Sequence, residues 1–336
     1  MRRAKKVTKL RAFDLFCGAG GSSYGARAAG MSIAGGVERA PLAAKTFRDN
    51  FPGAKVFQQD IRYLSAKAVA KEIGTIDLLL ASPECTNHTI AKGKKRIIRA
   101  AQISRMTAYA VTRFAKALKP RWIAVENVVQ MRQWSRFKHW QNELERLGYN
   151  VSIQVLDASK FGVRQSRRRL FVLCDRLAVP AIVKTANCRP KPVRPILNMN
   201  GAYQYSLLTK KGRAKPTLAR ARRGIRGAGS GRPFLMVYYG TDGSGGWQPL
   251  NVPLRTITTV DRFALVKRIQ GRYRMRMLQV PELKQAMGFP LSFKMTRGNR
   301  RNKIAMLGNG VCPPVMAAIV KKLLSSPVDA GKMNDA

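Results

Sequence analysis

The feature that most constrains the fold is an alternation of strand-like and helix-like segments in the first 175 residues. Short runs rich in β-branched, aromatic and other apolar residues, such as IDLLLASP at 76–83 and RRLFVLCD at 168–175, indicate strands. Helix-like stretches such as MTAYAVTRFAKAL at 106–118 separate most of them. This alternation predicts βαβ units and a largely parallel, doubly wound sheet. Only a loop joins the strands at 150–157 and 168–175, so we expect an antiparallel edge there.

The composition is dominated by positive charge. Lys and Arg total 63 against 17 Asp and Glu, a net charge of +46, which indicates a polyanionic partner such as nucleic acid. On charge alone, a ribosomal-type binding protein stays possible. The five cysteines form no CxxC pair, which argues against a disulfide framework or a zinc module and favours a reducing cytoplasm. No secretory signal is evident and no apolar stretch approaches about 18 residues, so we expect a cytoplasmic, nucleoid-associated protein without a membrane partner.

The texture of the chain changes after Asp175. No acidic residue follows until Asp242, while Pro, Gly, Lys and Arg are frequent, so the sequence predicts a second, smaller basic region. Disorder is an open alternative for residues 210–232, where the bias is strongest. From LRTITTVDRFALV at 254–266 onward the sequence again has the pattern of regular secondary structure, and it ends with an apolar helix and a polar tail. The expected domain ranges are 1–175, 176–275 and 276–336, the last returning to the first domain.

A glycine cluster follows the first predicted strand. Gly18, Gly20 and Gly21 permit a tight turn and a close approach of backbone to a ligand. The dinucleotide fingerprint G-x-G-x-x-G is incomplete because Ser23 holds its last position. Glu38 ends the second strand, where a carboxylate can accept hydrogen bonds from both hydroxyls of a ribose.

We expect Asp60 to end the third strand, where it can accept a hydrogen bond from an adenine amino group. Ligands of open α/β sheets bind beyond the carboxyl ends of the strands, where these groups fall. The absence of a well-formed phosphate-binding turn favours S-adenosylmethionine over NAD. The alternative is an ordinary glycine turn with solvent-facing acids.

A second set of reactive side chains is expected at the same edge of the sheet. Cys85 follows the fourth strand, and Glu126 with Asn127 ends the fifth. Arg167 and Arg169 have the same parity, so they are expected to share one face of a strand. A thiol, a carboxylate and a guanidinium would then converge near a sulfonium methyl donor.

This constellation suits methylation of carbon 5 of cytosine. A thiolate that adds to carbon 6 makes carbon 5 nucleophilic, a carboxyl group at N3 stabilises the developing charge, and an arginine can hold O2. The base must first leave the duplex. The alternatives are a buried packing cysteine and, because His88 lies three residues on, a Cys–His hydrolase.

The segments DLFCGAGG, ENV, QSRRR, RTITTVDRFALV and GNGVCPP resemble, in order and spacing, the motifs of DNA (cytosine-5)-methyltransferases over most of residues 11–325. The resemblance implies a class I S-adenosylmethionine-dependent methyltransferase fold, Rossmann-like, with a smaller target-recognition domain at 176–275. It implies that Cys85 is the nucleophile, that Glu126 contacts N3 and that Arg167 lies in the pocket. Further implied site residues are Pro83, Asn127, Gln165 and Arg169 for catalysis, and Phe16, Gly18, Gly20, Gly21, Glu38, Arg39, Asp60, Ile61, Asn309 and Val311 for the cofactor.

The sequence departs from the family at the nucleophile. The usual Pro-Pro-Cys-Gln is replaced by Pro83-Glu84-Cys85-Thr86, which retains the first proline and the cysteine. We expect a monomer that binds double-stranded DNA between two lobes, converts S-adenosylmethionine to S-adenosylhomocysteine, needs no metal, and is paired with a restriction enzyme in some hosts. The alternatives are an RNA (tRNA) cytosine-5 methyltransferase of the same fold and an inactive nucleic-acid-binding relative.

Overall fold

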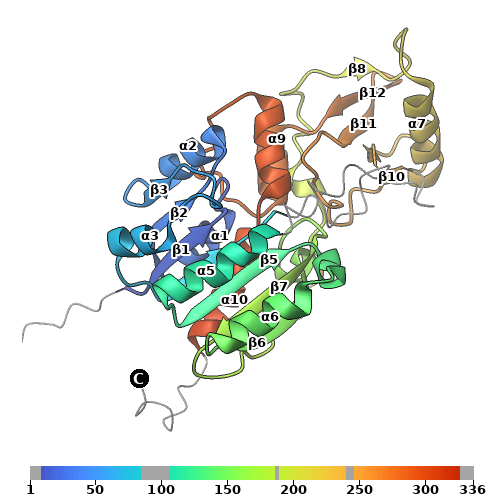
Figure 1. The fold of residues 1–336 in the computed structure, drawn as a ribbon. Coiled ribbons are helices and arrows are strands. Elements are labelled where there is room, and N and C mark those ends of the chain that lie inside the picture. The colour runs from blue at the N-terminus through green and yellow to red at the C-terminus, as the bar shows by residue number, and fades with distance from the viewer. Residues whose placement is uncertain (1–8, 85–105, 186–188, 240–245, 326–336) are drawn as a thin grey trace, which may run out of the picture. The chain divides into compact units, whose positions relative to one another are not determined.

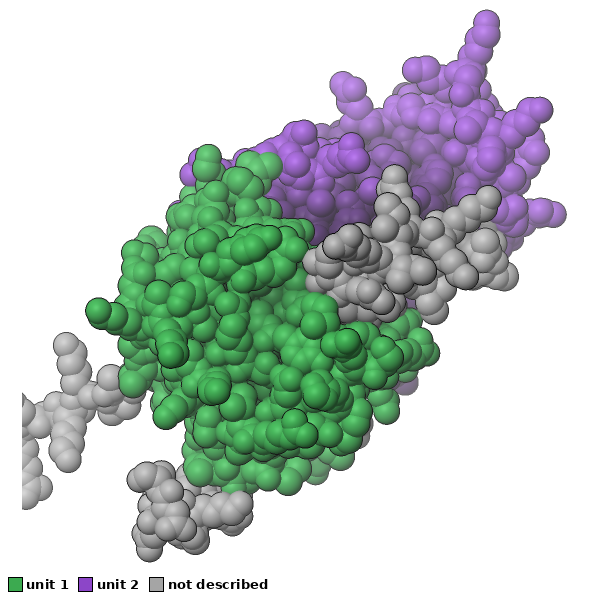
Figure 2. Space-filling view, in the orientation of Figure 1, with its two compact units in different colours: residues 1–157, 168–186, 310–336 green, residues 158–167, 187–309 purple. Residues whose placement is uncertain are grey.

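The structure, a computed structural model, describes residues 9–84, 106–185, 189–239 and 246–325. The chain forms two compact units, coloured separately in Figure 2. Unit 1 comprises residues 1–157, 168–186 and 310–336, and unit 2 comprises residues 158–167 and 187–309. The chain therefore leaves unit 1 twice and returns to it. The domain ranges expected from the sequence, 1–175, 176–275 and 276–336, differ from these boundaries and stay a prediction.

Unit 1 is built on a seven-stranded sheet with the strand order β3-β2-β1-β4-β5-β7-β6. All neighbouring pairs are parallel except those of β7, which runs antiparallel to β5 and β6. This confirms the predicted parallel sheet with its antiparallel edge (Figure 1). The strands are β1 (Arg11–Leu15), β2 (Ser32–Val37), β3 (Lys55–Phe57), β4 (Leu78–Ala81), β5 (Trp122–Asn127), β6 (Asn150–Asp157) and β7 (Arg168–Asp175).

The core of unit 1 follows from the two-residue repeat of its strands. Phe13 and Leu15 of β1 join a buried apolar cluster with helices α3, α5 and α6. Asp14 lies between them, so its side chain points to the opposite face, where α1 lies. Figure 1 shows α5 and α6 in front of the sheet and α10 behind it. The helices are α1 (Gly21–Ala28), α2 (Pro41–Asn50), α3 (Ala66–Ile73), α5 (Tyr109–Leu118), α6 (Phe137–Arg146) and α10 (Pro313–Leu324).

Helix α1 packs against α10 through glycine. A Cβ atom on Gly21 would lie 2.3 Å from the carbonyl oxygen of Val311, and one on Gly25 would lie 2.6 Å from that of Pro313. These distances exclude any side chain at the two positions. The helix that follows the glycine turn is thus held in place by the last helix described.

Unit 2 is built on a five-stranded antiparallel sheet with the order β10-β9-β11-β12-β8. A small apolar cluster that includes Phe234, Met236 and Val266 lies between this sheet and α7. The elements are β8 (Ser206–Leu207), α7 (Lys215–Ala228), β9 (Phe234–Val237), β10 (Trp247–Gln248), β11 (Phe263–Ile269), β12 (Arg272–Met277), α8 (Val280–Ala286) and α9 (Arg300–Asn309).

Helix α7 occupies the stretch for which the composition left disorder open. Its glycines form the contact face: a Cβ on Gly224 would lie 2.1 Å from the ring of Phe234, and one on Gly227 would lie 2.0 Å from that of Trp247. Arg222 on the same helix is exposed. The glycines thus allow close packing, which leaves the arginine-rich face of the helix outermost.

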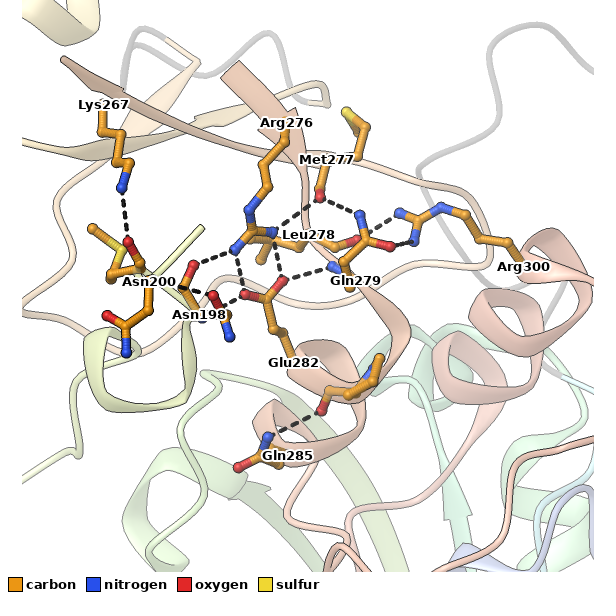
Figure 3. Close-up of polar contacts among 12 residues, drawn as sticks. Asn198, Asn200, Lys267, Arg276, Met277, Leu278, Gln279, Glu282, Gln285 and Arg300 are labelled. Atoms are coloured by element: carbon orange, nitrogen blue, oxygen red, sulfur yellow. Dashed lines mark hydrogen bonds and ion pairs between the residues drawn. The ribbon is translucent and has the colours of Figure 1, made fainter. Parts of the chain in front are cut away.

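A buried ion pair organises the junction between β12 and α8. Both nitrogens at the tip of Arg276 bond to the Glu282 carboxylate, at 2.8 and 2.6 Å (Figure 3). The same carboxylate accepts hydrogen bonds from the backbone N–H groups of Gln279 (2.7 Å) and Asn198 (2.8 Å). Glu282 therefore caps its own helix and fixes the 194–200 loop against it.

One segment of the described residues, Arg300–Leu324, is long and apolar enough to cross a membrane by length and composition. The expectation that no stretch approaches this length is therefore wrong on that measure. The segment is 56% buried over its most apolar window and carries α9 and α10. A buried core helix passes the same test, so this is weak evidence for a membrane span.

Candidate active site

The glycine turn after β1 is tied to the carboxylate that ends β2. The backbone N–H of Gly18 donates to Oε2 of Glu38 at 3.0 Å, and that of Ala40 donates to Oε1 at 2.7 Å. Gly18 has a φ of +54°, and a Cβ atom built on it would meet no heavy atom within 4 Å. Burial raises the pKa of the half-buried Glu38 carboxyl. The Glu38 carboxylate is thus bonded to the backbone of Gly18, beside which there is room for further atoms.

The Asp60 carboxylate lies among arginines. Arg62 donates to both of its oxygens, at distances of 2.6 to 3.2 Å, and this contact lowers the pKa of Asp60 to about 2. Nη1 of Arg39 lies 3.9 Å from the same carboxylate, and Nη2 of Arg39 lies 2.9 Å from Glu84. Asp60 is thus ionised throughout the physiological range. Arg39 links it to the segment that leads to Cys85.

The remaining predicted cofactor residues fall into three settings. Phe16 has a φ of +58°, a left-handed conformation that is uncommon outside glycine, and its side chain is partly exposed. Gly20 has a φ of +100° and abuts the ring of Phe51, while Val311 is buried against Gly21. Asn309 is exposed at the end of α9.

These features fit an adenosine cofactor. An ionised carboxylate has about four lone-pair sites, and the hydrogen bonds that Glu38 accepts from Gly18 and Ala40 leave acceptor capacity for ribose hydroxyls. The space at Gly18, after β1, lies beside that carboxylate. Asp60, which follows β3 on the far side of β2, offers further acceptors. The residues present are therefore compatible with S-adenosylmethionine.

A buried carboxylate and an arginine meet across β5 and β7. Oε1 of Glu126 lies 3.0 Å from Nε of Arg169, and their side chains are 8% and 17% exposed. Glu126 pairs directly with Phe171 in the ladder, so Arg169, two residues before Phe171, is its diagonal neighbour on the same face. This pair is the strongest polar feature at the end of β5.

Asn127 connects the end of β5 to the end of β4. Its Nδ2 donates to the carbonyl oxygen of Pro83 at 3.1 Å, and its Oδ1 accepts from the N–H of Val128 at 2.8 Å. Both groups are buried. The predicted nucleophile Cys85 lies outside the described residues, as does His88. The Asn127 contact holds the backbone at Pro83, two residues before Cys85 in the sequence.

Gln165 and Arg167 form hydrogen bonds to residues of unit 2. Arg167 donates to the carbonyl oxygens of Ile257 (3.0 Å) and Gly308 (2.7 Å), all within unit 2. Gln165 accepts from the N–H of Ile257 at 2.8 Å and donates to the sulfur of Met287. Arg169 contacts Glu126, as described above. The placement of Arg167 in the pocket stays a prediction.

Sequence reasoning missed two polar groups of unit 1, the buried Asp14 and the exposed Arg113. Asp14, in the apolar run of β1, accepts from the hydroxyl of Ser23 at 2.6 Å, and burial raises its pKa to about 7. Arg113 of α5 donates to the carbonyl oxygens of Ile61 and Leu64 and so holds the loop after Asp60. A single charged residue within an apolar segment was the available signal in both cases.

Metal-binding clusters are a separate question. Within the ranges that the structure describes, no group of three or more His, Cys, Asp or Glu side chains could hold a metal ion. The expectation that the protein needs no metal stays a prediction.

Comparison with known proteins matches this chain to one family and one fold. Residues 10–325 match the family model described as C-5 cytosine-specific DNA methylase. The type II methyltransferase M1.HphI of Haemophilus parahaemolyticus is 34% identical over 166 residues, which is 48% of this chain and 44% of that protein. M.AquIA of Picosynechococcus is 31% identical over 179 residues, covering 49% of this chain and 71% of that protein.

Among solved structures, a Spodoptera frugiperda DNMT2 mutant superposes with a TM-score of 0.69 at 16% identity. That superposition covers 94% of this chain and the whole of the other. At this identity it shows that the fold is shared. The match to M1.HphI spans less than half of that protein's length.

Proposed function

The chain belongs to the C-5 cytosine-specific DNA methylase family, and we propose that it transfers a methyl group from S-adenosylmethionine to carbon 5 of cytosine in double-stranded DNA. The observation that carries this proposal is the buried pair of Glu126 and Arg169 beside the segment that leads to Cys85. A carboxyl group held by a guanidinium at the end of a parallel strand suits recognition of a flat, polar base.

We assign the chemistry to three side chains. The Cys85 thiolate adds to carbon 6 of the cytosine, while Glu126 hydrogen-bonds N3 and stabilises the charge that develops on the ring. Arg169 contacts the Glu126 carboxylate, and we assign to it the contact with O2 as well. Bound S-adenosylmethionine supplies an electrophilic methyl group. Carbon 5 would take this methyl group, with S-adenosylhomocysteine as the leaving group. Loss of the carbon 5 proton to solvent and elimination of the Cys85 sulfur would then restore the aromatic ring.

We assign the cofactor to the ends of β1, β2 and β3. Glu38 would accept the ribose hydroxyls and Asp60 the adenine amino group, while Phe16 would contact the adenine ring. The Gly18 backbone lines the same space. Arg62 keeps Asp60 ionised and thus an obligate acceptor.

Charge favours DNA as the substrate. Helix α7 presents Arg222 and Arg226, four residues apart and both exposed, on one side of the helix. Duplex DNA carries one negative charge per about 1.7 Å along its axis, so a row of arginines matches its backbone. A target base must also be turned out of the duplex before a thiol reaches carbon 6.

The test is bisulfite sequencing of DNA and tRNA from a methylation-free bacterial host that expresses the protein. We expect protected cytosines in one DNA sequence context, absent with Cys85→Ser and retained with the matched variant Cys188→Ser. DNA binding by Cys85→Ser should stay within a few-fold of wild type at the same salt concentration. Protection in tRNA alone would assign the RNA reaction instead, and protection in neither would contradict catalysis.

We further propose a monomer that acts in the cytoplasm, associated with the nucleoid, and that is accompanied in some hosts by a restriction enzyme of the same specificity. The relatives named as type II methyltransferases support the last of these. Sedimentation of the purified protein with and without duplex DNA tests the oligomeric state.

A further inference from the structure

The Asp60 carboxylate has most of its hydrogen-bonding capacity occupied. Arg62 donates to it from its backbone N–H (3.0 Å), from Nε (3.0 Å) and from Nη2 (2.6 Å). An ionised carboxylate accepts about four hydrogen bonds, so these contacts leave about one acceptor site on Asp60. The Asp60 side chain is 23% exposed, and a donor on a ligand can therefore reach that site.

A second arginine lies close to the same acceptor. Nη1 of Arg39 lies 3.9 Å from Oδ2 of Asp60, which is beyond hydrogen-bonding distance. The Arg39 side chain is 59% exposed, so it has the freedom to come closer. A direct hydrogen bond from Arg39 would occupy the acceptor that Arg62 leaves on Asp60.

Glu84 attracts Arg39 in the other direction. Nη2 of Arg39 lies 2.9 Å from Oε1 of Glu84, which is a direct ion pair. Glu38 also interacts electrostatically with Arg39, but its carboxylate accepts hydrogen bonds from the backbone. Glu84 and Asp60 thus compete for one guanidinium, and the shorter distance belongs to Glu84.

The backbone that carries Glu84 is held on two sides. The N–H of Glu84 donates to the hydroxyl of Thr107, in the turn before α5, at 3.3 Å. The carbonyl oxygen of Pro83 accepts a hydrogen bond from Asn127 of β5 at 3.1 Å. The carboxylate that pairs with Arg39 therefore extends from a fixed point of unit 1.

The ion pair of Arg39 and Glu84 has little value for the stability of the fold. The two side chains are 59% and 27% exposed, and solvent screens ion pairs of this kind. Glu84→Gln should therefore fold as wild type does. Its effect should appear in ligand binding.

We propose that Glu84 is a positioning residue of the cofactor site, which holds Arg39 away from Asp60 and so keeps an acceptor of Asp60 available for the amino group of adenine. The inference rests on the proposed assignment of the adenine amino group to Asp60. It gives Glu84 a task in cofactor recognition that is carried out through Arg39.

The consequence is a preference for purines with an amino group at position 6. S-inosylhomocysteine has a carbonyl oxygen there, which only accepts hydrogen bonds and is repelled by the Asp60 carboxylate. Once Glu84 no longer holds it, Arg39 would occupy the acceptor of Asp60 and present a donor to position 6. The preference for adenine over hypoxanthine should then decrease.

The test compares the binding of S-adenosylhomocysteine and S-inosylhomocysteine by isothermal titration calorimetry, without DNA. The measured quantity is the ratio of the two dissociation constants. The proteins are wild type, Glu84→Gln, Arg39→Gln and the double variant. The matched control is Glu72→Gln, which removes an exposed carboxylate that forms an ion pair with Lys55 at 2.5 Å in the same unit.

We expect wild type to prefer S-adenosylhomocysteine by about tenfold or more, the effect of one hydrogen bond to a charged group. Glu84→Gln should reduce this ratio about 3- to 10-fold, and Glu72→Gln should leave it unchanged. In the Arg39→Gln background, the further change Glu84→Gln should alter the ratio less than about twofold, because no guanidinium then competes for Asp60.

An unchanged ratio in Glu84→Gln, or an equal reduction in the Arg39→Gln background, would overturn the inference. Wild type that binds neither compound would refute the inference together with the proposed cofactor site. If the ratios change as expected while the bisulfite experiment finds no methylated cytosine, the inference stands and the proposed reaction fails. If wild type methylates DNA while Glu84→Gln keeps the full preference, the proposed function stands and the inference fails.

Discussion

The two units use their acidic side chains in opposite ways. In unit 1, Glu38 and Asp60 follow the ends of β2 and β3, and Glu126 is the last residue but one of β5. In the described part of unit 2 the acidic residues are Asp261 and Glu282, and each is paired with an arginine of the same unit. Arginines also contact Asp60 and Glu126 in unit 1, but these two acids and Glu38 lie at the edge of a parallel sheet, where ligands bind, whereas the acids of unit 2 join segments of the fold.

This difference between the units indicates how a strongly basic chain can have both an acidic binding site and a cationic surface. The edge of a parallel sheet gathers side chains from strands that are far apart in sequence, so carboxylates placed there converge. An antiparallel sheet with small cores offers no such edge. Its buried carboxylate, Glu282, neutralises Arg276 inside the unit, and Arg222 and Arg226 of α7 remain exposed.

The largest effect should come from removing a site carboxylate in unit 1. Glu126→Gln should lower the single-turnover methylation rate about 10²–10⁴-fold, because an amide cannot take the charge-stabilising role of a carboxyl group at N3. Circular dichroism should show the same secondary structure as wild type. A rate within threefold of wild type would remove Glu126 from the mechanism and weaken the contrast between the units.

The counterpart in unit 2 should affect stability. Glu282→Gln leaves Arg276 buried without its counter-charge, and breaking a buried pair typically costs about 3–5 kcal/mol. Urea unfolding should show this loss, with the transition assigned to unit 2 by the fluorescence of Trp247. The rate per folded molecule should stay near that of wild type. A large fall in that rate without loss of stability would mean that acids of unit 2 also act in catalysis.

A smaller effect concerns the buried carboxyl of β1. Burial raises the pKa of Asp14 from 3.8 to about 7, so the folded protein binds this proton more tightly than the unfolded chain. The associated stability is complete below about pH 3.8 and is lost as the pH rises to about 7. Asp14→Asn should therefore be more stable than wild type by about 1–3 kcal/mol at pH 8 and nearly equal to it at pH 4.

The matched control for this pH dependence is Asp60→Asn. The pKa of Asp60 is lowered to about 2, so its stabilising contribution is present above pH 3.8 and is lost only as the pH falls through about 2. The stability difference between Asp60→Asn and wild type should thus be constant from pH 4 to pH 8. Melting curves without cofactor test both variants. A constant difference for Asp14→Asn as well would contradict its raised pKa.

The smallest effect should appear in the outer face of α7. Replacing Arg222 and Arg226 with Ser should weaken duplex binding about three- to tenfold near 0.15 M salt and reduce the log–log salt slope by about 1.8, if each contacts one phosphate. The control is Lys67→Ser with Lys71→Ser, an exposed pair at the same spacing on α3 of unit 1. An equal loss of DNA affinity in the control would show that only net charge matters, and it would contradict the assignment of DNA binding to the α7 surface of unit 2.

The sequence predicted the parallel sheet and the positions of Glu38, Asp60 and Glu126 because strand ends are marked by local pattern. The expectation that Arg167 and Arg169 share one face of a strand is wrong, because alternation of faces holds only inside a strand, and β7 begins at Arg168. Arg167 lies one residue before that strand, where the backbone direction is set by its contacts in unit 2.

Two other features were beyond local pattern. Glycine and arginine in α7 resemble disordered composition, and only the tight packing of Gly224 and Gly227 on aromatic rings explains them. The pair of Arg39 and Glu84 joins residues that are 45 positions apart in the sequence. Such a contact depends on the spatial neighbourhood of β2 and β4, which follows from the order of strands and not from any spacing.

The packing of α1 on α10 has a consequence for synthesis on the ribosome. Almost all of the described chain lies between Gly21 and Val311, so α1 emerges long before the helix that covers it. At about 5–20 residues per second, the wait is roughly 15–60 s. The face of α1 that will later contact α10 includes Gly21 and Gly25. Because glycine has no side chain, this face exposes little apolar area to chaperones or to other nascent chains. The nascent protein can thus leave α1 uncovered without exposing a large apolar surface.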